Sequence, residues 1–67
     1  MELRDIVQAL AKYAADVSGP AFAQEHGWDW ASCRRIIAAN KSLIHMTKTE
    51  PPMIMLTPVG RTAAARK

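Results

Sequence analysis

The chain has 67 residues, of which 49% are hydrophobic, and it carries a formal net charge of +3 at neutral pH. A chain of this length makes a single domain, residues 1–67, with a small core, and its apolar share excludes a disordered polymer. Its single cysteine excludes an internal disulfide and favours a reducing, cytoplasmic compartment, and no apolar run approaches the ~18 residues of a membrane span.

The first predicted element is a helix over Leu3–Asp16. Its apolar residues recur at helical spacing, and the apolar face is formed by Leu3, Ile6, Val7, Leu10, Ala14 and Val17. Neither glycine nor proline interrupts this stretch. We therefore expect an amphipathic helix that turns its apolar face to the core.

Two further helices follow after a short break in the pattern at Ser18-Gly19-Pro20. Proline is favoured in the first turn of a helix, so the second helix is expected over Pro20–His26, with Gly27 supplying the left-handed position that ends it. Asp29 is a plausible N-cap for a third helix over Trp30–Asn40. Because only about three residues link these helices, a helix-turn-helix corner is expected.

The periodicity changes after the third helix. Leu43–Thr49 and Met53–Thr57 are rich in β-branched and apolar residues, and Glu50-Pro51-Pro52 between them cannot continue a strand. This pattern predicts a β-hairpin. Thr57-Pro58 then resembles a cap and first helical position for a short helical tail over Val59–Arg66. The predicted fold is α+β: three helices, a two-stranded hairpin and a short C-terminal helix.

Three segments resemble winged helix-turn-helix regulators of bacteria and phages. Phe22–Gly27 resembles the second-helix pattern of such proteins, and Ser42–Ile44 resembles the exit from the recognition helix into the wing. Leu56–Arg61 is similar to the Leu-Thr-Pro-x-Gly-Arg stretch that closes the wing in regulators of the MarR and PadR type. The resemblance implies a small transcriptional regulator that binds double-stranded DNA sequence-specifically, with the third helix in the major groove and the wing on the backbone.

The basic side chains are concentrated in the second half of the chain, which also contains the predicted third helix and wing. Residues 1–28 sum to −2, with two basic and four acidic side chains, whereas residues 29–67 sum to +5, with seven basic and two acidic. A basic half of this kind favours a polyanionic partner. The predicted DNA-binding residues lie on the third helix, on the wing and just after it: Trp30, Ser32, Arg34, Arg35, Lys41, Lys48 and Arg61.

The chemistry of these side chains suits DNA, although each has a second interpretation. Arginine pairs bidentately with guanine, and lysine contacts phosphate. Alternatively, Arg34 and Arg35 form a solvated helix face, and Lys48 only protects an edge strand from aggregation. Trp30 either packs beneath the wing or stacks on a partner.

A second function remains open from the sequence, a protein-interaction module on the same scaffold, for example a phage-encoded inhibitor or adaptor. Exposed tryptophans and three methionines would then form an apolar docking face, whereas in the first hypothesis the methionines fill the core beneath the wing. The methionines are Met46, Met53 and Met55.

The sequence gives no support for an enzyme, a metal site or a cofactor. Cys33, His26 and His45 lack the spacing of known zinc ligands, and we expect Cys33 to be a small buried apolar residue. A homodimer that joins the first helix and the C-terminal tail would supply burial that so small a core lacks.

Overall fold

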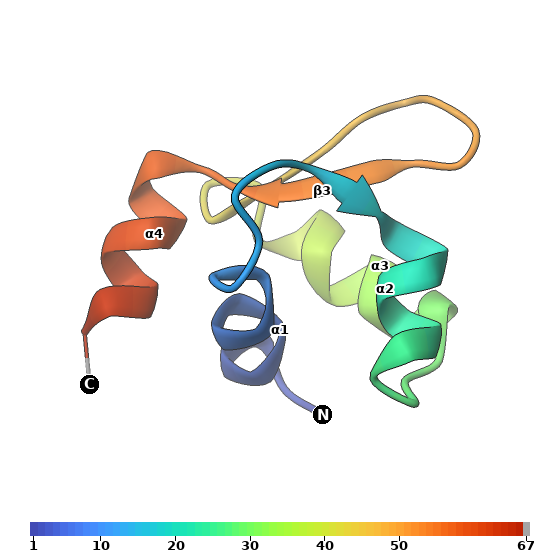
Figure 1. Cartoon of the computed structure of the whole chain (residues 1–67), viewed down its shortest axis with the longest axis horizontal. Coiled ribbons are helices and arrows are strands. Elements are labelled where there is room, and N and C mark those ends of the chain that lie inside the picture. The colour runs from blue at the N-terminus through green and yellow to red at the C-terminus, as the bar shows by residue number, and fades with distance from the viewer. Residues whose placement is uncertain (67) are drawn as a thin grey trace.

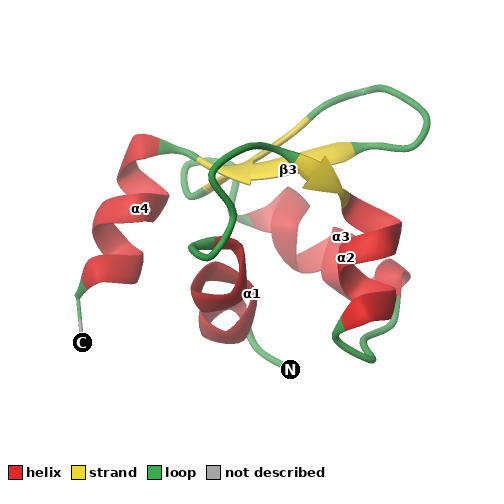
Figure 2. Cartoon of the chain, viewed as in Figure 1, coloured by secondary structure: helices red, strands yellow, loops and turns green. Residues whose placement is uncertain are grey.

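Residues 1–66, which are the residues that the computed structural model describes, form four helices and a three-stranded antiparallel sheet. Figures 1 and 2 show the sheet along one side of the molecule, with the first three helices beneath it and the last helix at one end. The elements in chain order are α1 (Leu3–Leu10), β1 (Val17–Ser18), α2 (Gly19–Glu25), α3 (Trp30–Ala39), β2 (Ile44–Met46), β3 (Met53–Leu56) and α4 (Pro58–Ala65).

The predicted α+β class is confirmed, but the sheet contains a strand that the sequence did not predict. The strand order is β1-β3-β2, so the hairpin β2–β3 gains a third strand from the segment before α2. Val17 pairs with Ile54, and Ile44 pairs with Leu56. Val17 was assigned to the apolar face of the first helix, and that assignment is wrong because the residue packs on the core from the sheet.

The first helix is also shorter than predicted, since α1 ends at Leu10 rather than Asp16. The backbone then tightens into a turn, in which the amide of Tyr13 donates to the carbonyl of Leu10 over 3.0 Å. Tyr13 packs edge-on against Phe22, with ring centroids 6.0 Å apart. The early end of α1 lets the chain reverse and reach β3, so a tertiary contact overrides local helix propensity.

The turn between α2 and α3 follows the sequence prediction closely. Gly27 has φ 71°, and the amides of Gly27 and Trp28 donate to the carbonyls of Gln24 and Ala23 over 3.0 and 2.8 Å. These two bonds satisfy the free carbonyls at the end of α2 in a Schellman motif. The Asp29 carboxylate then accepts from the Ser32 amide over 3.1 Å and caps α3.

The hairpin loop is longer than the predicted turn of Glu50-Pro51-Pro52. Because β2 ends at Met46 and β3 begins at Met53, residues 47–52 connect the strands. The Thr47 hydroxyl accepts from the Met53 amide over 2.9 Å and occupies the place of a further ladder bond. The side chain of Thr47 thus ends the pairing earlier than β propensity alone would.

The predicted helical tail is present as α4, one residue ahead of its expected bounds. The Thr57 hydroxyl accepts from the Gly60 amide over 3.0 Å, as the predicted cap should, and Pro58 occupies the first turn. α4 packs beside α1, where the Gln8 side chain donates to the Ala64 carbonyl over 3.0 Å (Figure 1).

The core lies between the sheet and the three helices α1, α2 and α3. Cys33 is fully buried there, as predicted, and Met46 packs against the core from the hairpin. Met53 and Met55 pair with Ser18 and His45, which places them on the opposite, outer face of the sheet. The buried hydrophobic residues are Ile6, Val7, Ala9, Leu10, Phe22, Ala23, Cys33, Ile37, Ile44, Ile54 and Leu56.

Candidate nucleic-acid interface

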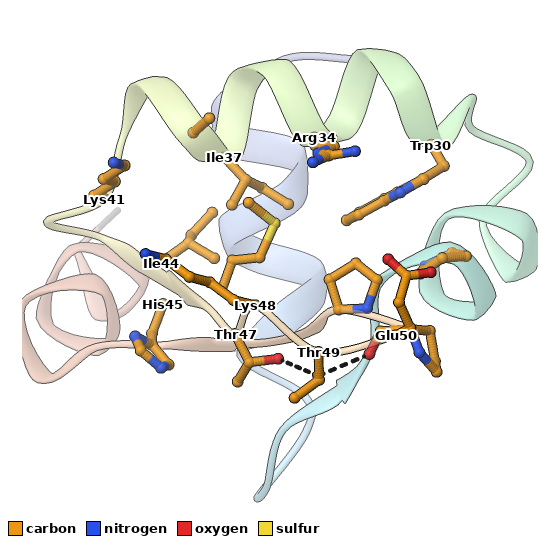
Figure 3. Close-up of a pocket in the computed structure, with 15 residues that line it drawn as sticks. Trp30, Arg34, Ile37, Lys41, Ile44, His45, Thr47, Lys48, Thr49 and Glu50 are labelled. Carbon is orange, nitrogen blue, oxygen red and sulfur yellow. Dashed lines mark hydrogen bonds between the residues drawn. The ribbon is translucent and has the colours of Figure 1, made fainter.

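A groove of about 720 Å³ lies between α3 and the hairpin. Figure 3 shows Trp30, Arg34 and Ile37 projecting from α3 towards the hairpin, with Thr47 and Lys48 on the opposite wall. Four of the seven predicted DNA-binding residues line this groove: Trp30, Arg34, Lys41 and Lys48. The sequence could not show that residues from two elements share one surface.

Three exposed cations line the groove, two on the side of α3 and one on the hairpin loop. Arg34 lies on α3 and Lys41 in the turn just after it, and both are exposed. Lys48 is exposed on the hairpin loop across from them. Since exposed cations in one concave surface reinforce each other's field, this part of the groove attracts anions.

Trp30 closes the other end of the groove and is held there by its neighbours. Its indole lies against Gly19, where even a Cβ atom would overlap the ring. Pro20, Pro51 and Pro52 line the same region. Trp30 is half-buried and packs against the core, in agreement with the packed interpretation rather than with a fully free stacking platform.

The hairpin loop that carries Lys48 is tied down by its threonines. The hydroxyls of Thr47 and Thr49 lie 2.7 Å apart, and Thr49 donates to the Pro51 carbonyl over 3.0 Å (Figure 3). Because the Thr49 proton is used in that bond, Thr47 donates to Thr49. At the end of the loop, the Gly19 amide donates to the Pro52 carbonyl over 2.8 Å, so the loop is anchored on α2.

Three predicted residues do not line the groove. The Ser32 hydroxyl donates to the Asp29 carboxylate over 3.1 Å and so belongs to the cap of α3. Arg61 lies on α4, where its guanidinium donates to the Tyr13 carbonyl over 3.5 Å, away from the groove. Arg35 is exposed on α3, next to Arg34 but on the adjoining flank of the helix.

Sequence reasoning missed Glu50 and Gly19 as parts of this surface. Glu50 lines the groove near Trp30 and adds a negative charge at the proline-rich end, whereas the sequence indicated only a turn residue (Figure 3). Gly19 was assigned to the break before the second helix. No local signal could have revealed its role as the seat of Trp30, because the contact joins the starts of two different helices.

Trp28 lies outside the groove, beside α2. Its indole stacks on the His26 ring, with centroids 4.8 Å apart and planes at 20°, and meets Phe22 edge-on at 5.8 Å. The His26 Nδ1 atom lies 3.0 Å from the Phe22 carbonyl oxygen and donates to it in the matching tautomer. Both tryptophans are thus partly buried rather than exposed.

Cys33 lies on the buried side of α3 and does not line the groove. Burial raises the pKa of its thiol above the ordinary value of 9.0, and the negative charge of Asp29 adds to this rise. A thiol with a raised pKa is a poor nucleophile at neutral pH. Within residues 1–66, no group of three or more acidic, histidine or cysteine side chains could hold a metal ion.

Comparison with known proteins identified no relative of this chain. No protein-family model matches the chain, and neither a curated protein nor a solved structure matches it significantly. None of the helices in residues 1–66 is both long and apolar enough to cross a membrane.

Proposed function

We propose that the chain is a winged helix-turn-helix domain that binds double-stranded DNA sequence-specifically, as a small transcriptional regulator. In this proposal α3 enters the major groove and the hairpin lies along the backbone as the wing. The observation that carries the proposal is the groove between α3 and the hairpin, which is lined by Arg34 from α3, Lys41 from the turn after it and Lys48 from the hairpin loop.

Two features of the fold support this function. A four-residue turn, His26–Asp29, joins α2 to α3, and a hairpin follows α3 directly, as in domains that place their second corner helix in the major groove. α3 itself also contains no acidic side chain, and Asp29 stands only at its cap. A helix face that carries basic but no acidic side chains is the electrostatic footprint of a nucleic-acid partner.

The test is binding to mixed-sequence duplex DNA, followed by fluorescence anisotropy over a series of salt concentrations. The Arg34→Ala, Arg35→Ala double variant should lose roughly tenfold or more in affinity at low salt. Lys12→Ala, which removes one positive charge outside the groove, is the control, because Lys12 is an exposed cation in the turn after α1. Absence of binding at low salt, or equal affinity in the double variant, would refute DNA binding by α3.

The second candidate is a protein-interaction module on the same fold, and the apolar end of the groove favours it. Trp30, Pro20, Pro51 and Pro52 form a surface with little cationic character, and Glu50 beside them would repel phosphate. If this function holds, Trp30→Ala abolishes binding to a protein partner, whereas the double arginine variant retains it.

The proposed homodimer would join α1 and α4 of two copies. These helices pack together away from the groove, and a hollow of about 560 Å³ between them is lined in part by Leu3, Val7 and Leu43. Association through this face would leave both grooves free for DNA. Sedimentation equilibrium tests the dimer, and a monomer mass at micromolar concentration would refute it.

A further inference from the structure

We infer that the two adjacent arginines of α3 have different tasks on DNA: Arg35 contacts the edge of a guanine base, and Arg34 contacts a phosphate. This inference rests on the proposed function and adds which side chain determines the target sequence. Sequence reasoning grouped the two residues, and only their placement around α3 separates them.

Arg34 belongs to the flank of α3 that faces the hairpin. It shares this flank with Ile37, Lys41 follows in the turn after α3, and Lys48 stands on the opposite wall of the groove (Figure 3). A DNA strand that lies between α3 and the wing would run along this groove. Its phosphates would meet three cations, while its bases would point away from the hairpin. Arg34 is therefore placed to bind the backbone.

Arg35 belongs to the flank that faces solvent. An α-helix turns by about 100° per residue, so this side chain projects beyond the groove that Arg34 lines. The residues one turn before and after it are Ala31 and Ala38, which are exposed and short, and Ala38 also lines the groove. They leave room for the helix to approach a base pair closely. Arg35 is thus the long polar side chain at the centre of the exposed face.

The other predicted base contacts at the start of α3 are engaged within the protein. The Ser32 hydroxyl bonds to Asp29 over 3.1 Å, and the Trp30 indole is seated against Gly19. Arg35 is consequently the side chain that remains free to contact a base. Its planar fork of donors matches the two acceptors, O6 and N7, that guanine presents in the major groove.

The experiment compares Arg34→Gln with Arg35→Gln by selection from a randomised duplex DNA library. Both substitutions remove one charge, and both sites are exposed, so circular dichroism should show an unchanged fold. Glutamine pairs with adenine as arginine does with guanine. Arg35→Gln should change one guanine of the selected motif to adenine and weaken binding to the original site roughly 5- to 100-fold.

Arg34→Gln should retain the selected motif. It should weaken binding to all duplexes alike and reduce the slope of log affinity against log salt by about 0.9, the value for one lost phosphate contact. A motif changed by Arg34→Gln, or left unchanged by Arg35→Gln, would overturn the assignment while DNA binding itself stood. Absence of any duplex binding by the unaltered protein at low salt would overturn both.

Discussion

At the scale of single residues, the contact between Gly19 and Trp30 sets the shape of the groove. The indole occupies the space that a Cβ at position 19 would need. Alanine normally favours a helix more than glycine, so Gly19→Ala would stabilise α2 in isolation. In the folded chain the added methyl displaces the ring instead, and the wall of the groove moves with it.

We therefore predict that Gly19→Ala lowers the free energy of unfolding by about 1–2 kcal/mol, as overpacking does. Urea denaturation of the variant measures this change. In a Trp30→Ala background the same substitution should cost nothing or stabilise, because the clash is absent. An equal effect of Gly19→Ala in both backgrounds would contradict the contact, since a double-mutant cycle isolates such a pair.

Cys33 provides a second prediction at this scale, on pH dependence. Burial, assisted by Asp29, raises the pKa of the folded-state thiol above the 9.0 of the unfolded chain. The protonated thiol therefore contributes stability that is fully present below pH 9.0 and is lost as pH rises through the folded-state pKa.

The measurement is the difference in free energy of unfolding between the unaltered protein and Cys33→Ala, followed from pH 7 to above pH 10 by urea denaturation. Other titrating groups cancel in this difference. It should be constant up to pH 9 and shrink above it. A difference that stays constant throughout would show that the thiol titrates alike in the folded and unfolded chain.

At the scale of elements, β1 determines where α1 ends and how the sheet is completed. Its two residues face opposite ways, because side chains alternate along a strand. Val17 pairs with the buried Ile54 on the core side, whereas Ser18 pairs with Met53 on the outer side and also precedes α2 as its N-cap. The same substitution should therefore affect the stability of the fold differently at Val17 and at Ser18.

We predict that Val17→Asp lowers the free energy of unfolding by about 2 kcal/mol or more, because a charge replaces an apolar side chain against the core. Ser18→Asp should be neutral or slightly stabilising, because aspartate is favoured at an N-cap. Urea denaturation of the pair tests both. Equal destabilisation by the two variants would refute the orientation of β1.

At the scale of the whole molecule, the basic second half of the chain divides between two regions. Figure 1 shows α4 and the hairpin loop at opposite ends of the sheet. Arg61 lies on α4 near Tyr13, whereas Lys41 and Lys48 line the groove. The charge distribution along the sequence assigned these three residues to one predicted binding surface, whereas the fold places Arg61 apart from the two lysines.

The expected consequence concerns the salt dependence of the proposed binding to duplex DNA. Under this proposal, Lys41→Ala and Lys48→Ala should each reduce the slope of log affinity against log salt by about 0.9, the value for one lost phosphate contact. Arg61→Ala should leave the slope unchanged, since its side chain lies outside the groove. Anisotropy titrations between low and moderate salt test this, and a slope that depends on Arg61 but not on Lys48 would place the DNA elsewhere.

Local signals in the sequence were sufficient for the features that depend on neighbours in the chain. The Asp29 and Thr57 caps and the Gly27 turn between α2 and α3 are each determined by a few consecutive residues, and the structure bears them out. The α+β class follows from the same signals, because the hydrophobic period changes after the third helix. Burial of Cys33 follows from its place on the apolar side of that helix.

Features that join distant segments were decided by the tertiary structure alone. The early end of α1, the pairing of Val17 with Ile54 and the seating of Trp30 on Gly19 each need a partner from elsewhere in the chain. The same holds for the groove, which gathers Arg34 and Lys48 but leaves Arg61 aside. Sequence periodicity shows which side of an element is apolar. Packing decides which other element meets that side, and this choice determines which side chains share one surface.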